Sequence, residues 1–111
     1  MLAVKRSGER QPFDAAKIVA GMRAAAKNRP LSVDDLENVA VEIEERLRLE
    51  GGGDDVATER IGLAVLDRLR SLDPVAYLRF ASVYMEFDDP ADFEREAGLL
   101  TKATAPKHAG P

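Results

Sequence analysis

Residues 2–18 read Leu-Ala-Val-Lys-Arg-Ser-Gly-Glu-Arg-Gln-Pro-Phe-Asp-Ala-Ala-Lys-Ile, a stretch that turns from strand-like to helix-like composition at Asp14. Residues 2–5 predict a strand, and Ser7-Gly8 is a dipeptide that favours a turn. Residues 10–13 predict the return strand, and Pro12 lacks the backbone N–H of a central strand, so it restricts this strand to an edge or to its own end. The stretch therefore predicts a β-hairpin followed by a helix.

Two amphipathic helices are predicted directly after the hairpin, because apolar residues recur there every three or four positions. Asp14 is a suitable N-cap for a helix that runs to about Lys27 and ends before Arg29-Pro30. Ser32 starts the second helix, because its pairing with Asp35 resembles a capping box. The glycines at 51–53 end this helix.

Three further helices are predicted in the remaining chain. Thr58 is expected to cap the third, and Val56 just before it predicts a short third strand. Asp73-Pro74 and Asp89-Pro90 each combine a capping aspartate with a proline suited to the first helical turn. The last helix is expected to run to about Leu100. We therefore assign residues 1–96 to one domain with a C-terminal helix, and residues 97–111 to a disordered tail.

The expected core consists of one apolar stripe from each of the first four helices. These stripes are Ile18, Met22 and Ala25; Leu36, Val39, Ile43 and Leu47; Ile61, Val65, Leu69 and Leu72; and Tyr77, Phe80, Ala81, Tyr84 and Phe87.

The charges are unevenly distributed along the 111 residues, whose formal net charge is −4. Residues 1–29 hold seven basic and two acidic residues, a net charge of +5, whereas the rest carries −9. Such asymmetry favours a local anion site over a surface that coats nucleic acid, although an uneven solvated surface is the alternative. No apolar run approaches the ~20 residues of a membrane span, so we expect a cytoplasmic chain without membrane contact.

Catalytic chemistry is not indicated. The sequence has no cysteine, which excludes disulfides, cysteine-ligated zinc and a cysteine nucleophile. The single histidine, His108, lies in the expected tail, and neighbouring carboxylates such as Asp88-Asp89 are typical of caps and solvated surfaces. We therefore expect a protein that is not an enzyme.

A basic cluster in the hairpin and the first helix is the strongest candidate site. Strand alternation predicts that Lys5 and Arg6 point to opposite faces, and Lys17 belongs to the first turn of the following helix, where free N–H groups attract anions. Together they could grip a polyphosphate without a Walker glycine loop, which the sequence lacks. The alternative is an ordinary solvated hairpin. Lys27 and Arg29 are expected to remain surface charges.

Two segments carry a resemblance to a known family. Residues 3–18 resemble the opening of the ATP-cone domain: a hydrophobic strand, Lys-Arg-x-Gly, Pro-Phe and a helix with Lys-Ile or Lys-Val. Residues 73–87, Asp-Pro-Val-Ala-Tyr-Leu-Arg-Phe-Ala-Ser-Val-Tyr-Met-Glu-Phe, followed by Asp92-Phe93, resemble the NrdR-type transcriptional repressors of ribonucleotide reductase genes. The similarity runs from Ala3 to Glu96.

The resemblance implies an α+β, mainly helical fold: a small helical bundle capped by a short three-stranded sheet. It also implies that ATP and dATP bind as allosteric signals, and that nucleotide sets the state of a homo-oligomer. Mg²⁺ could accompany the phosphates, but the sequence shows no evident protein ligand for it. The nucleotide-binding residues that it implies are Lys5, Arg6 and Lys17 for the phosphates, Ala3 and Val4 along the nucleotide, Thr58 near the base or sugar, Tyr84 in the pocket lining, and Gln11.

Three departures from the family pattern qualify the resemblance. Gln11 stands where the family usually has glutamate, and Ala3 replaces a larger aliphatic residue. The repressors also carry a zinc ribbon with four cysteines, so this chain is expected to hold no zinc and to contact DNA only if a ribbon is supplied elsewhere. The alternatives are a stand-alone ATP-cone that regulates a reductase or another enzyme in trans, and a helical interaction module without a ligand.

Overall fold

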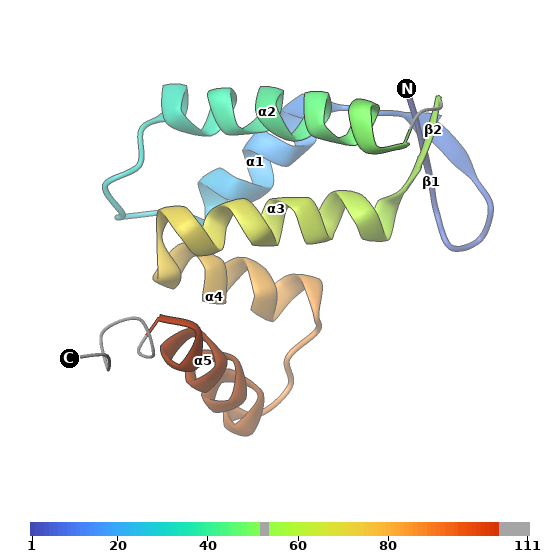
Figure 1. The fold of residues 1–111 in the computed structure, drawn as a ribbon. Helices are drawn as coiled ribbons and strands as arrows, with labels where there is room; N and C mark the ends of the chain where they lie inside the picture. Colours follow the sequence, from blue (N-terminus) through green and yellow to red (C-terminus); the bar gives the residue numbers. More distant parts are fainter. Residues whose placement is uncertain (52–53, 105–111) are drawn as a thin grey trace.

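The computed structural model describes residues 1–51 and 54–104. The elements follow the order β1 (Leu2–Val4), β2 (Arg10–Pro12), α1 (Ala15–Ala25), α2 (Val33–Gly51), β3 (Asp55–Ala57), α3 (Thr58–Leu72), α4 (Pro74–Tyr84) and α5 (Pro90–Thr104). The helices pack beside one another, and the small sheet lies at one end of the bundle, next to the start of α3 (Figure 1). The predicted mainly helical α+β fold is confirmed.

The sheet has the strand order β2-β1-β3. β1 pairs antiparallel with β2, where Ala3 faces Gln11, and parallel with β3, where Ala3 faces Val56. The predicted third strand at Val56 is therefore confirmed. Pro12 lies on the edge strand β2, where its missing N–H removes no hydrogen bond from the interior of the sheet.

The loop between β1 and β2 begins earlier than predicted. β1 ends at Val4, so the expected strand alternation at Lys5 and Arg6 is wrong. Lys5 closes the loop instead: its N–H donates to the Glu9 carbonyl and its carbonyl accepts from the Gly8 N–H, both at 2.8 Å. Gly8 has a φ of 91°, which glycine adopts without a steric penalty. The turn around Gly8 therefore occupies the whole segment between Val4 and Arg10.

Local capping determines where several helices start. The Asp14 carboxylate accepts from the Ala16 N–H at 3.0 Å, as predicted for the start of α1. Ser32 and Asp35 form a reciprocal capping box, because each side chain accepts from the other residue's N–H at 3.0 Å. These contacts confirm the predicted starts of α1 and α2.

The predicted cap at Thr58 is wrong. β3 passes directly into α3, so Thr58 is already the first helical residue and Ala57 occupies the N-cap position. An alanine methyl group cannot accept a hydrogen bond, and the first turn of α3 therefore begins without a side-chain cap.

The core forms where α1, α2, α3 and α4 meet. The stripe of α2 is buried as predicted, and so are Val65 and Leu69 of α3. Leu72 and Tyr84 are more than one third exposed, because each lies at the C-terminal end of its helix. The prediction that both belong to the core is therefore wrong. The largest fully buried side chains are Met22, Leu36, Ile43, Val65 and Leu69.

Arg29 is not the surface charge that we predicted. Its Nε donates to both carboxylate oxygens of Asp73, at 2.9 and 3.1 Å, and Asp73 also accepts from the Val75 and Ala76 N–H groups. Burial alone would raise the pKa of Asp73. The net effect is a pKa below its ordinary value, because the carboxylate accepts hydrogen bonds from the Ala76 N–H, the Arg29 guanidinium and the Val75 N–H. This junction ties the end of α1 to the start of α4.

The last helix, α5, packs mainly against α4. Buried Tyr77 donates its hydroxyl to the Glu96 carboxylate at 3.0 Å, which links the two helices. α5 continues to Thr104 rather than ending near Leu100, because residues 101–104 contain no helix breaker, so residues 97–104 of the expected tail are helical. Residues 105–111 lie outside the described residues. None of the described helices is long and apolar enough to span a bilayer.

Candidate functional site

The predicted site residues of the strands and of the start of α3 lie at the end of the molecule that holds the sheet (Figure 1). Ala3 is buried in the central strand and faces Gln11 of β2, which is half-buried. Val4 faces Ala57 of β3, directly before half-buried Thr58. The strand register therefore places Gln11 beside Ala3 on one side of the central strand, and Thr58 close to Val4 on the other.

Glu59, in the first turn of α3, connects two of the other predicted residues. The Tyr84 hydroxyl, at the end of α4, donates to the Glu59 carbonyl oxygen at 3.0 Å. Arg6, from the hairpin loop, donates from Nε to the Glu59 carboxylate at 3.5 Å. A cationic side chain and an aromatic ring thus meet at one residue of α3, although they come from opposite ends of the sequence.

The position of Tyr84 depends on Gly62. The tyrosine ring lies so close to this buried position of α3 that a Cβ at residue 62 would overlap it. Tyr84 also stacks on Phe80, with ring centroids 6.3 Å apart and an interplanar angle of 20°. The sequence signal for this contact is a glycine inside an otherwise amphipathic helix.

The cations of the hairpin are paired with carboxylates. Arg6 pairs with Glu59, as described, and Lys5 Nζ lies 3.8 Å from Glu9 Oε2. Arg10 reaches across the central strand to Asp55, with Nη2 and Oδ2 3.1 Å apart. All three cations remain exposed, so these surface ion pairs contribute little to stability. Lys17 is exposed in the first turn of α1.

An apolar cavity of about 500 Å³ adjoins Tyr84, between α1 and α4. Small residues of α1 line one side, and larger side chains of α4 line the other. Arg79 lies at its edge, where Nη1 donates to the Ala25 and Lys27 carbonyls at 3.2 and 2.6 Å. Tyr84 is the one predicted site residue among those that line this cavity. Its principal lining residues are Gly21, Ala24, Ala25, Phe80, Val83 and Tyr84.

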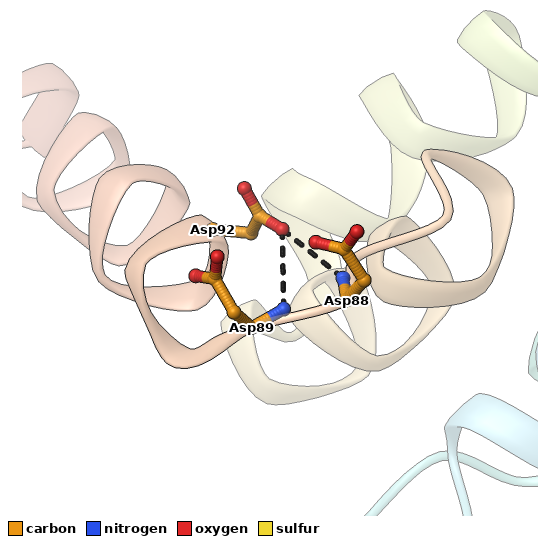
Figure 2. A group of neighbouring side chains, drawn as sticks. All are labelled: Asp88, Asp89 and Asp92. Atoms are coloured by element: carbon orange, nitrogen blue, oxygen red, sulfur yellow. Dashed lines mark hydrogen bonds between the residues drawn. The ribbon is translucent and has the colours of Figure 1, made fainter.

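Asp88, Asp89 and Asp92 bring three carboxylates together at the start of α5 (Figure 2). The Asp92 carboxylate accepts from the Asp88 and Asp89 N–H groups at 3.1 and 3.4 Å, and Asp89 accepts from the Ala91 N–H at 2.7 Å. The N–H of Asp88 is the main cause that lowers the pKa of Asp92. These contacts explain the cluster as a helix cap, which confirms the predicted start signal at Asp89-Pro90.

Comparison with known proteins gives the chain clear relatives. Residues 1–90 match the family described as "ATP cone domain". The chain is 48% identical over 102 residues to the "Transcriptional repressor NrdR" of Corynebacterium glutamicum, and 44% identical over 110 residues to that of Salinispora tropica. These matches cover 92% and 99% of the chain, and 67% and 71% of the respective relatives.

Proposed function

The chain belongs to the ATP-cone family, and from this premise we propose that it is a nucleotide-sensing regulatory domain of a ribonucleotide reductase repressor. On this proposal ATP and dATP bind as allosteric signals rather than as substrates. The relatives that carry the name of a transcriptional repressor support a regulatory role rather than an enzymatic one. The same names support a cytoplasmic location.

The observation that carries the proposal is the meeting of Arg6 and Tyr84 at Glu59. A nucleotide joins an anionic phosphate chain to a flat aromatic base, and these two parts need a cationic group and an apolar or aromatic surface side by side. The guanidinium of Arg6 offers the first. Tyr84 and the apolar cavity next to it offer the second.

We assign roles to the predicted residues on this basis. Lys5, Arg6 and Lys17 bind the phosphates, and Mg²⁺ can accompany them. Lys17 supports this role through its place in the first turn of α1, where backbone N–H groups and the helix dipole favour an anion. The strand residues Ala3 and Val4 lie along the nucleotide, and Gln11 also contacts it. Thr58 lies near the base or the sugar, and Tyr84 lines the pocket.

Titration calorimetry with ATP and dATP tests the proposal. Lys17→Ala is expected to weaken binding by at least about 1 kcal/mol, roughly fivefold, because a charge-assisted contact is lost. Lys27→Ala is the matched control, since it removes the same charge from a position beyond α1 and should leave affinity unchanged. The proposal is wrong if neither nucleotide binds at millimolar concentration.

We further propose that nucleotide sets the oligomeric state of a homo-oligomer, and that DNA is contacted only where a zinc ribbon is supplied elsewhere. The acidic remainder of the chain supports the second point, because phosphate backbones bind clustered cations.

The alternative is regulation of a reductase or another enzyme in trans. Phe93 and Leu99 favour this alternative, since both side chains of α5 are about half exposed and would suit a docking helix.

A further inference from the structure

We propose that Glu59 sets the nucleotide affinity of this site by competing with the phosphates of the ligand for Arg6. This inference rests on the proposed function, because it assigns a specificity-determining residue to the same site. Its effect falls on ligands whose phosphates reach Arg6. Glu59 thereby lowers the affinity for a nucleoside triphosphate without affecting the contacts to the base.

The ion pair between Arg6 and Glu59 is the first ground for this inference. The side chain of Arg6 is 91% exposed, and its Nε lies 3.5 Å from Glu59 Oε1. A carboxylate at this distance offsets the positive charge that would attract a phosphate. When a phosphate approaches Arg6, either the carboxylate moves aside or two anions stand next to each other. Both outcomes cost binding free energy.

The place of Glu59 on α3 is the second ground. The side chain lies in the first turn of a helix that begins without a side-chain cap, and the positive end of the helix dipole favours a carboxylate there. The Glu59 side chain therefore keeps a favourable electrostatic interaction with the start of α3 after Arg6 leaves it. The Tyr84 hydroxyl holds the backbone at residue 59 through the carbonyl oxygen, so only the side chain of Glu59 can move aside.

This geometry makes Glu59→Gln a clean test. The substitution keeps the size of the side chain and removes its charge, and the contact with Tyr84 survives because it uses the main-chain carbonyl. Glu94→Gln is the matched control: it removes the same charge from an exposed position of α5, which lies away from the sheet (Figure 1). Adenosine is the matched ligand, since it carries the base and the sugar of ATP but no phosphate.

The experiment titrates ATP and adenosine into the wild-type chain, Glu59→Gln, Arg6→Gln, the double variant and Glu94→Gln. We expect Glu59→Gln to tighten ATP binding about two- to fivefold, the range of an exposed ion pair, and to leave adenosine affinity unchanged. In the Arg6→Gln background the tightening should fall to the level of the Glu94→Gln control.

Two results overturn the role of Glu59. One is unchanged ATP affinity in Glu59→Gln while the wild-type chain binds ATP. The other is equal tightening with and without Arg6, which indicates a general effect of net charge. A wild-type chain that does not bind ATP overturns the proposed function together with this inference, so the two failures are distinguishable.

Discussion

Gly62 shows how one residue positions the aromatic side chain of the site. A glycine inside a helix costs up to about 1 kcal/mol relative to alanine, and here it lets the Tyr84 ring lie against α3. We expect Gly62→Ala to stabilise a Tyr84→Ala variant by about 1 kcal/mol, because only the helix propensity then changes. In the wild-type background the displaced ring and its lost hydrogen bond offset this gain.

Chemical denaturation of the four variants in this cycle measures the coupling between residues 62 and 84. The single Tyr84→Ala variant provides the reference for the loss of the ring itself. If Gly62→Ala changes the free energy of unfolding by the same amount in both backgrounds, the ring does not rest on residue 62 in solution. The stacking of Tyr84 on Phe80 would then be its main contact.

At the scale of elements, the contact between Arg29 and Asp73 joins the end of α1 to the start of α4. We expect Asp73→Asn to lower the free energy of unfolding by about 1–3 kcal/mol at neutral pH, since asparagine still caps the helix but loses the ion pair. The folded state lowers the pKa of Asp73, so the ionised carboxylate stabilises the protein above its ordinary pKa of 3.8. This contribution is lost as the pH falls below that value.

Urea unfolding of the wild type and Asp73→Asn at a series of pH values from 7 downward checks this expectation. The difference between the two proteins should narrow below about pH 4, because the Asp73 carboxylate of the unfolded wild-type chain becomes protonated there before that of the folded protein. Asp67→Asn is the control, since the exposed pair of Asp67 with Arg46 should contribute less than about 1 kcal/mol. A difference that stays constant down to pH 2 would show that ionisation of Asp73 does not matter.

The starts of several helices could be predicted because a cap is a local interaction. Asp14 and the Ser32–Asp35 pair bond to backbone within three residues, so the sequence alone indicates them. The cap predicted at Thr58 is wrong because pairing with β1, which is distant in sequence, keeps the chain in β3 up to Ala57. The contact of Arg29 with Asp73 spans 44 positions and has no local signal.

The candidate site also combines residues that the sequence indicates with residues that it does not. Its cations could be found from the residue types and the resemblance to a family, since Lys5, Arg6 and Lys17 stand in a short motif. The carboxylates that pair with Arg6 and Arg10 could not be predicted from the sequence. They belong to Glu59 and Asp55, which reach the hairpin only after the chain folds back as β3 and α3. The positive end inferred from the charge count is therefore partly offset by nearby carboxylates.

At the scale of the whole molecule, exposed apolar side chains offer surface for self-association. Leu49 and Val83 are 85% and 79% exposed, and Leu63 is 56% exposed. A nucleotide can change the assembly only if it binds one oligomeric form more tightly than another, and a tenfold preference corresponds to about 1.4 kcal/mol per site. The proposed function therefore requires that binding and assembly be thermodynamically linked.

Analytical ultracentrifugation of the chain alone, with ATP and with dATP, tests this link. We expect the sedimentation distribution to shift with at least one nucleotide, and the shift to need more nucleotide in Lys17→Ala than in Lys27→Ala, because assembly follows occupancy of the site. If calorimetry shows binding but the distribution never changes, self-assembly is not the response. Regulation of an enzyme in trans then becomes the better explanation, because α5 still presents Phe93 and Leu99 to a partner.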